Sequence, residues 1–201
     1  MASYPTALII LDMQNDLCHA EGVYARNGLA ATHVPVILPN IINTVHFCHK
    51  NRIPVIATQL TVLSDIDGNA MGLGVYSKLR PFLEKEGFRP ETWGYDLLDA
   101  IPKVDYKVRK WNLSAFYDTE LERYLSSLDC VELVLVGFTT NGPIETTARE
   151  AISRNYKITT LIDCVASYSE ALHQASITNL SSFGQVLKSE EWMQNYISNN
   201  P

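Results

Sequence analysis

Residues 133–155 read LVLVGFTTNGPIETTAREAISRN, and this stretch decides the fold class. Its first five residues form an apolar run that predicts a fully buried strand. A helical pattern follows from Pro143, so the chain turns sharply from a strand into the start of a helix. Such a turn offers free N–H groups and the positive end of a helix dipole, which suits a nucleophile and an oxyanion site. Proline supplies neither a nucleophilic side chain nor an N–H.

The same alternation of strand and helix runs along the whole chain. Apolar runs predict strands at residues 7–11, 54–58, 105–108, 132–136, 157–162 and 185–187. Helical patterns occupy residues 34–50, 118–128, 143–155, 169–182 and 190–196, and Asp118 or Thr119 is a candidate cap for the second of these. This order predicts a parallel α/β sheet covered on both faces. Residues 60–95, rich in Gly, Asp and Pro, predict a long excursion that shapes a binding site or an interface.

Composition bounds the class of protein. The chain has 201 residues, of which 46% are hydrophobic, so we expect one domain spanning 1–201. The net charge is −6 and no Lys/Arg cluster occurs, which argues against a nucleic-acid partner. No apolar run approaches the roughly 20 residues of a membrane span, and the N-terminus does not resemble a signal peptide. The four cysteines are scattered without a CxxC pair, which predicts free thiols and a cytoplasmic location.

Three predicted strand ends carry polar residues at the edge of the sheet where parallel α/β proteins bind ligands. Asp12 follows the first strand and is either a general acid or base or a turn former. Lys110 follows the third strand, and it either holds a carboxylate ionised or lies at the surface. The turn after the fourth strand places Pro143 at the first helical position, with Thr140 or Asn141 as a cap.

Other reactive side chains favour structural roles. Cys164 is interpreted as a small buried hydrophobe, and His173 as a hydrogen-bonded structural histidine. Asp65 and Asp67 form a pair in a loop without a nearby histidine, which predicts a solvated turn. We therefore expect no metal and no cofactor.

Four segments resemble, in order, the signature blocks of the isochorismatase-like (cysteine hydrolase) superfamily: ALIILDMQNDLCHAEG (7–22), KWNLSAFYDTELERYL (110–125), VGFTTNGPIETTAREA (136–151) and LIDCVASYSEALHQASITNL (161–180). The segment ETWGYDLL (91–98) is similar to the ureidoacrylate amidohydrolase-like subgroup. The resemblance implies a three-layer α/β/α fold, a doubly wound, mostly parallel six-stranded sheet, and a homo-oligomer, either a dimer or a tetramer.

The resemblance also implies an Asp–Lys–Cys triad, whose positions here hold Asp12, Lys110 and Pro143. In the family mechanism a thiolate attacks a carbonyl or nitrile carbon, and backbone N–H groups stabilise the oxyanion. Pro143 removes both the thiol and one N–H. A cis peptide is implied near Phe138–Thr139. We expect the substrate to contact Gln59, Trp93, Phe138, Thr139, Asn141 and Gly142.

Three functional hypotheses follow for a small-molecule partner. Isochorismate-cleaving members of the family carry glycine at the cysteine position and protonate a vinyl ether with the first-strand aspartate. By that resemblance, Asp12 is a general acid whose pKa is raised by burial, while Lys110 and Gln59 position the substrate. The alternative is a catalytically inactive, ligand-binding pseudoenzyme. A third hypothesis, which we favour least, moves the nucleophile to Cys164.

Overall fold

The computed structural model describes residues 5–200, and its centre is a six-stranded sheet in which every pair of neighbours is parallel. The strand order is β5-β2-β1-β6-β7-β8. The strands are β1 (Thr6–Leu11), β2 (Val55–Leu60), β5 (Tyr106–Lys110), β6 (Glu132–Phe138), β7 (Lys157–Ala166) and β8 (Gln185–Leu187). β1 and β6 are buried along nearly their whole length, as expected for central strands of a covered parallel sheet.

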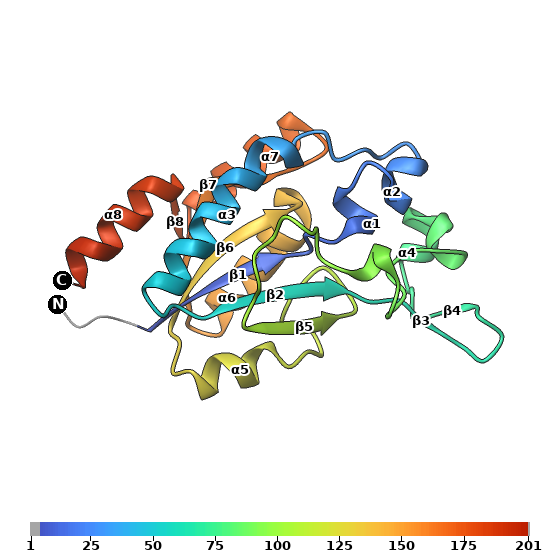
Figure 1. Ribbon diagram of the computed structural model, residues 1–201, viewed down its shortest axis with the longest axis horizontal. Coiled ribbons are helices and arrows are strands. Elements are labelled where there is room, and N and C mark those ends of the chain that lie inside the picture. Colours follow the sequence, from blue (N-terminus) through green and yellow to red (C-terminus); the bar gives the residue numbers. More distant parts are fainter. Residues whose placement is uncertain (1–4, 201) are drawn as a thin grey trace.

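Helices cover both faces of the sheet (Figure 1). One face carries α3 (Val34–Lys50) and α8 (Ser189–Asn199), whose apolar side chains, among them Ile41, Val45 and Trp192, pack in one core. The other face carries α5 (Leu121–Ser127), α6 (Glu145–Ser153) and α7 (Glu170–Ser181), which contribute Leu125, Ala148 and others to a second core. The predicted three-layer α/β/α fold is confirmed.

The excursion from 60 to 95 lies at the carboxyl end of the strands (Figure 1). It contains the two-stranded hairpin β3 (Leu63–Ser64) and β4 (Ala70–Met71), the short helix α4 (Tyr76–Leu79) and two 3-10 turns, η1 (Pro81–Glu84) and η2 (Trp93–Tyr95). The helices α1 (Asn15–Cys18) and α2 (Val23–Arg26) lie at the same end. Asp16 ties these parts together, because its carboxylate accepts from the N–H groups of Val23 and Phe88 at 3.3 and 2.7 Å. The excursion is therefore anchored over the edge where ligands bind in such sheets.

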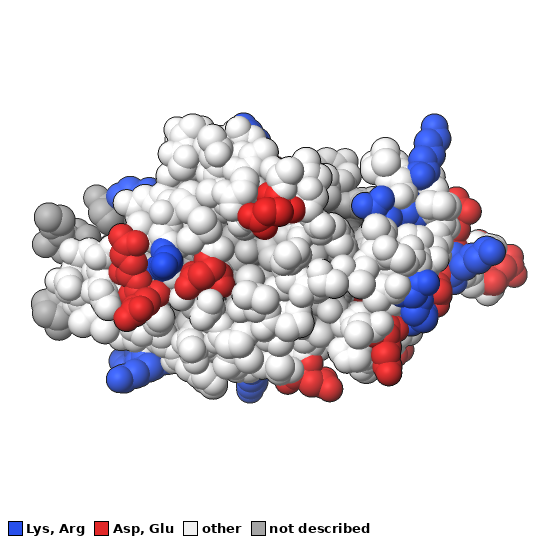
Figure 2. Space-filling model, turned by 90° about the horizontal axis from the view of Figure 1, so that it is seen from above, with Lys and Arg blue, Asp and Glu red and all other residues white. Residues whose placement is uncertain are grey.

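Charged side chains of both signs gather at this end of the molecule. Figure 2 shows Lys and Arg interspersed with Asp and Glu there, around the projecting hairpin and α4. The basic side chains on this face form no continuous patch of the kind that follows a nucleic-acid backbone.

Several predicted boundaries were wrong. β5 extends to Lys110 and β7 to Ala166, because pairing with neighbouring strands continues past the apolar runs. α5 begins at Leu121 rather than at 118, since Asp118 adopts a left-handed backbone (φ 53°). Glu120 occupies the cap position, although the Thr119 hydroxyl does accept from the N–H of Leu121 at 3.2 Å.

The start of the helix after β6 also differs from the prediction. Residues Thr140–Ile144 form a π-helical turn, η3, that continues into α6. Pro143 is thus the fourth residue of this helical segment, not the first, and the cap position belongs to Thr139 rather than to Thr140 or Asn141. Proline is still accommodated, because backbone N–H groups in the first turn of a helix lack intrahelical partners.

Candidate active site

Asp12 lies at the carboxyl end of β1 with almost no solvent exposure (3%). Its backbone is left-handed (φ 56°), which turns the carboxylate away from the strand direction. Thr58 on the neighbouring strand β2 donates its hydroxyl to Oδ1 at 2.6 Å and accepts the N–H of Asp12 at 3.3 Å. This double contact fixes the orientation of the carboxylate.

Lys110, the last residue of β5, reaches across β2 to the same carboxylate. Its Nζ lies 2.7 Å from Oδ2 of Asp12 and also donates to the carbonyl oxygens of Asn112 and Leu113 at 3.0 and 2.9 Å. Since an ammonium group has three donors, all of them have partners. Lys110 is only 1% exposed, so the surface interpretation of this lysine was wrong.

Burial dominates the electrostatics of this pair. Desolvation raises the pKa of Asp12 above its ordinary value, while Lys110 and the Thr58 hydroxyl pull it down. Desolvation likewise lowers the pKa of Lys110, and Asp12 opposes that shift. Both shifts favour the neutral forms, so protonating this carboxylate requires less free energy than protonating an exposed aspartate. Such a pair suits proton transfer.

The turn after β6 lies beside Asp12 because of a close backbone approach. Leu11 and Gly137 are register partners in β1 and β6. A Cβ on Gly137 would lie 2.2 Å from the carbonyl oxygen of Leu11, and the residue has φ 120°, so only glycine fits. The peptide bond between Phe138 and Thr139, directly after Gly137 and Phe138 in the chain, is cis, as the family resemblance implies.

Backbone N–H groups of that turn are bound within the turn itself. The N–H groups of Gly142 and Ile144 both donate to the carbonyl oxygen of Thr139, at 3.3 and 3.2 Å. Pro143 is buried and carries no N–H. Two of the donors that an oxyanion could use are therefore engaged by the chain itself, and a third is absent.

The polar side chains of the turn bind other parts of the protein. Thr140 Oγ1 lies 2.8 Å from Nδ1 of His173 on α7, and burial lowers the pKa of that histidine. Asn141 accepts a hydrogen bond from the Ser167 hydroxyl through Oδ1. These contacts hold the turn against α7 and the end of β7, and they give His173 the structural role expected for it.

The two remaining substrate-contact candidates lie around η2. Gln59 is buried and donates to the carbonyl oxygen of Tyr95 at 2.9 Å, so its amide is already used to hold η2. The carbonyl of Trp93 accepts from Asn15 at 2.8 Å, and its ring packs edge-to-face on His19 at 5.0 Å. Nearly half of Trp93 stays exposed at the rim of the site.

Several residues at this edge of the sheet were not predicted from the sequence. Thr58 is the most direct omission, although it adjoins Gln59 in the segment IATQ. A group of aromatic side chains, Tyr24, Tyr76 and Tyr168, also lies here, together with the guanidinium of Arg80. Tyr76 and Arg80 are neighbours on α4 and its C-cap, but Tyr24 and Tyr168 come from distant segments, and no spacing in the sequence relates them to α4.

Cys164 does not belong to the site. It lies inside β7 with no solvent exposure, packed under α3, where its sulfur is 3.8 Å from Thr44 Oγ1. Burial raises the pKa of its thiol to about 12, which leaves little thiolate at neutral pH. Asp65 accepts from the N–H groups of Asp67 and Asn69 in the hairpin turn, in agreement with a solvated turn.

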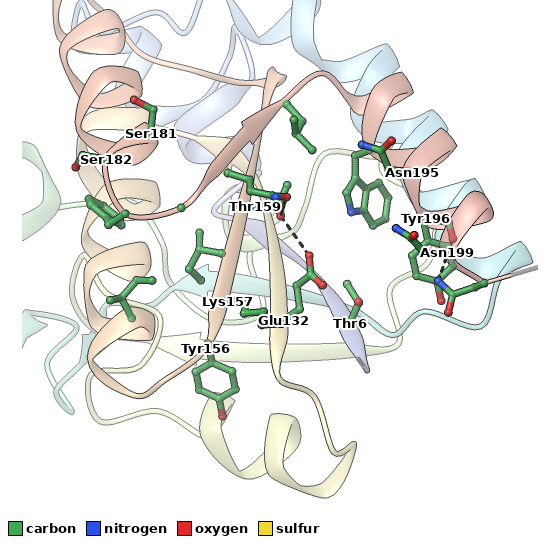
Figure 3. A pocket seen from close by; sticks show the side chains of 18 residues that line it. Thr6, Glu132, Tyr156, Lys157, Thr159, Ser181, Ser182, Asn195, Tyr196 and Asn199 are labelled. Atoms are coloured by element: carbon green, nitrogen blue, oxygen red, sulfur yellow. Dashed lines mark hydrogen bonds between the residues drawn. The ribbon is translucent and has the colours of Figure 1, made fainter. Parts of the chain in front are cut away.

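A separate hollow of about 920 Å³ lies at the amino ends of the strands, where β6 and β7 begin. Figure 3 shows it between the end of α7, with Ser181 and Ser182, and α8, with Asn195 and Tyr196. Glu132 accepts a 3.2 Å hydrogen bond from Thr159 in its wall. The described residues that line this hollow include no buried charge pair like that of Asp12 and Lys110.

Residues 5–200 contain no group of three or more His, Cys, Asp or Glu side chains arranged to hold a metal ion. Among the same residues, none of the helices is both long and apolar enough to cross a membrane.

Comparison with known proteins identifies related sequences along nearly the whole chain. The family model described as Isochorismatase domain matches residues 6–191. A probable inactive nicotinamidase of Arabidopsis thaliana is 28% identical over 184 residues, covering 89% of each chain. A ureidoacrylate amidohydrolase of Acinetobacter baylyi is 27% identical over 195 residues, covering 91% of this chain and 80% of that one.

Solved structures share the fold. A cysteine hydrolase from Pseudomonas syringae pv. phaseolicola superposes with a TM-score of 0.86 at 24% identity, covering 96% of this chain and 93% of that one. The fold and the polar edge of the sheet thus define an α/β/α hydrolase scaffold. The chain belongs to the isochorismatase family.

Proposed function

We propose that the protein is a small-molecule hydrolase that uses Asp12 as a general acid and forms no acyl-enzyme. The observation that carries this proposal is the intact, buried Asp12–Lys110–Thr58 cluster beside a turn whose residue 143 is proline. Burying the charges of Asp12 and Lys110 is electrostatically unfavourable, which favours a functional role for this pair. Proton transfer is such a role, and it requires only the carboxylate of Asp12.

The reaction that fits is hydrolysis of a vinyl ether of the isochorismate type. Asp12 transfers its proton to the terminal carbon of the double bond, which forms a C–H bond and leaves an oxocarbenium ion. Water adds to the carbon that bears the ether oxygen and returns a proton to Asp12. The resulting hemiketal collapses when its bond to the ether oxygen breaks and its hydroxyl proton passes to that oxygen, which releases pyruvate and an alcohol. Lys110 and Thr58 hold the carboxylate in place throughout.

The test is pyruvate release from isochorismate by the purified protein beside its Asp12→Asn variant. Loss of a general acid typically lowers the rate by about 10²–10⁴-fold. Asp65→Asn is the matched control, because this aspartate lies in the exposed hairpin turn, and it should keep full activity. Release that persists in Asp12→Asn, or that is missing from the unmodified protein, contradicts the proposal.

Asp12→Asn alone leaves Lys110 buried without its counter-charge, which can weaken the fold. The double variant Asp12→Asn/Lys110→Met removes both charges and serves as the second test. It should fold, as judged by its thermal unfolding midpoint, and should release no pyruvate.

A second candidate is a ligand-binding protein without turnover. Pro143 and the similarity to a relative named as probably inactive favour it. It predicts saturable binding of a small molecule, no turnover, and equal binding by Asp12→Asn and Asp65→Asn.

We further propose that the chain works in the cytoplasm as a single-domain homo-oligomer. Apolar side chains are exposed on the excursion at Leu63, Ile66, Met71, Val75 and Leu79, a surface suited to a second copy of the chain. The molar mass in solution, compared with that of an Ile66→Asp/Met71→Asp variant, tests the oligomer.

A further inference from the structure

A chain of ring contacts leads from the end of β6 to a cationic side chain. Phe138 and Asp12 are the residues that directly follow the register pair Gly137–Leu11 on the neighbouring strands β6 and β1. Its ring meets that of Tyr168 edge-to-face at 4.8 Å. Tyr168 in turn lies parallel to Tyr24 (6° between planes, centroids 6.4 Å apart), and the Arg80 guanidinium sits 5.9 Å above the Tyr24 ring.

Arg80 has no acidic partner. Within residues 5–200, no carboxylate approaches its guanidinium within 4.0 Å. The guanidinium donates to the carbonyl of its neighbour Leu79 at 2.7 Å. It also interacts with the Tyr24 phenol, where it opposes the rise in pKa that burial causes. Because a guanidinium has five N–H donors, others stay available. Arg80 is a half-buried residue, and a guanidinium with free donors suits a planar anion, which it can bind with two parallel hydrogen bonds.

The hydroxyl of Tyr168 is also unused. It is buried and has no hydrogen-bond partner among the described residues. Burying a hydroxyl without a hydrogen-bond partner is unfavourable, so a water molecule or a ligand is the expected partner of this group. Burial raises the pKa of Tyr168, so the phenol keeps its proton and can donate it in a hydrogen bond.

The aromatic group interacts electrostatically with the candidate active site. The charge of Asp12 contributes to raising the pKa of both Tyr24 and Tyr76, whose shifts come mainly from burial. Arg80 opposes both shifts. Asp12 and Arg80 therefore act on the same two phenols.

We propose that Arg80 and Tyr168 form a carboxylate-binding subsite, walled by the rings of Tyr24 and Phe138, which selects small planar carboxylates and holds them beside Asp12. The aromatic walls favour a flat, unsaturated skeleton, and Arg80 with the Tyr168 hydroxyl recognises the charged end. For its chemical purpose this inference rests on the proposed function, because a subsite there would orient the bond that Asp12 protonates.

Benzoate and benzamide are suitable probes, because they share a planar ring and differ in charge. Calorimetric titration of the full-length protein should show benzoate binding at least about tenfold more tightly than benzamide. Arg80→Gln should weaken benzoate binding by about 10–100-fold, as expected for a hydrogen bond to a charged group, and leave benzamide unchanged. The control Lys78→Gln, on the exposed side of α4, should behave as the unmodified protein.

Tyr168→Phe provides a test that is independent of folding. Its hydroxyl has no partner within the described chain, so the thermal unfolding midpoint should stay the same or rise, while benzoate binding falls several-fold. Equal binding of the two probes, no binding of either, or an Arg80→Gln variant that matches Lys78→Gln would overturn the subsite.

The two proposals fail separately. Selective benzoate binding that depends on Arg80, without pyruvate release from isochorismate, keeps the subsite and removes the vinyl-ether reaction. Pyruvate release that is unaffected by Arg80→Gln, together with equal binding of the probes, keeps the reaction and removes the subsite.

Discussion

The end of β1 and the turn after β6 lie side by side, yet they differ in what they retain. At the end of β1, Asp12 keeps a complete set of partners in Lys110 and Thr58. At the turn, the backbone keeps the cis peptide and the close approach of Gly137 to Leu11, but residue 143 is a proline. The backbone of the turn thus accommodates a proline at 143, and the Asp12–Lys110–Thr58 cluster is complete beside it.

The largest effect should come from breaking the charge pair at β1. Lys110→Met leaves the Asp12 carboxylate buried without its counter-charge, and we expect about 3–5 kcal/mol of unfolding free energy to be lost. Urea denaturation measures this loss. Adding Asp12→Asn should restore much of it, and a double variant no more stable than Lys110→Met would contradict the pairing.

The contact between the two regions can be broken at Gly137. In Gly137→Ala the positive φ alone should cost about 1–3 kcal/mol, with a further loss from the clash with the Leu11 carbonyl. Gly68→Ala is the matched control, since Gly68 also has a positive φ (85°) but open space where a Cβ would lie. Thermal unfolding should show a clearly larger drop for Gly137→Ala, and similar drops would refute the close approach.

Restoring a thiol at the turn sharpens the comparison. Pro143→Cys should change stability by less than about 1 kcal/mol, because the backbone of the turn already suits a helix start. Residue 143 is buried like the four native thiols, but it lies in the first turn of a helical segment, where the dipole favours the thiolate. Iodoacetamide and peptide mass mapping should therefore find the introduced thiol alkylated faster than the native thiols. A variant whose new thiol stays as inert as Cys164 would show that the turn no longer offers a nucleophile position.

The smallest effect concerns pH. A general acid must carry its proton, so kcat/KM should fall as the pH rises through the pKa of Asp12, at a midpoint above the ordinary aspartate value of 3.8. The Thr58 hydroxyl lowers this pKa, so Thr58→Val should move the limb to still higher pH. A pH–rate profile on isochorismate tests the direction, and a shift to lower pH would contradict it.

Sequence alone was sufficient for the layers and for the edge of the sheet where Asp12 and Lys110 meet. The apolar runs around Leu8 and Val134 predict strands buried on both faces, and their alternation with helices favours a parallel sheet. That topology brings the strand ends at Asp12 and Lys110 to one edge, whatever the details of packing. The resemblance to the family placed the cis peptide at Phe138–Thr139.

Tertiary structure decided the partners of these groups. Thr58 became a partner of Asp12 through the register of β2 against β1, and Lys110 was buried because β5 pairs two residues further than its apolar run. Arg80, Tyr24 and Tyr168 meet only because the excursion folds back over the sheet. A pattern in the sequence records the environment of each residue along its own element, whereas hydrogen bonds and ring contacts between distant segments depend on distances that only the packed chain fixes.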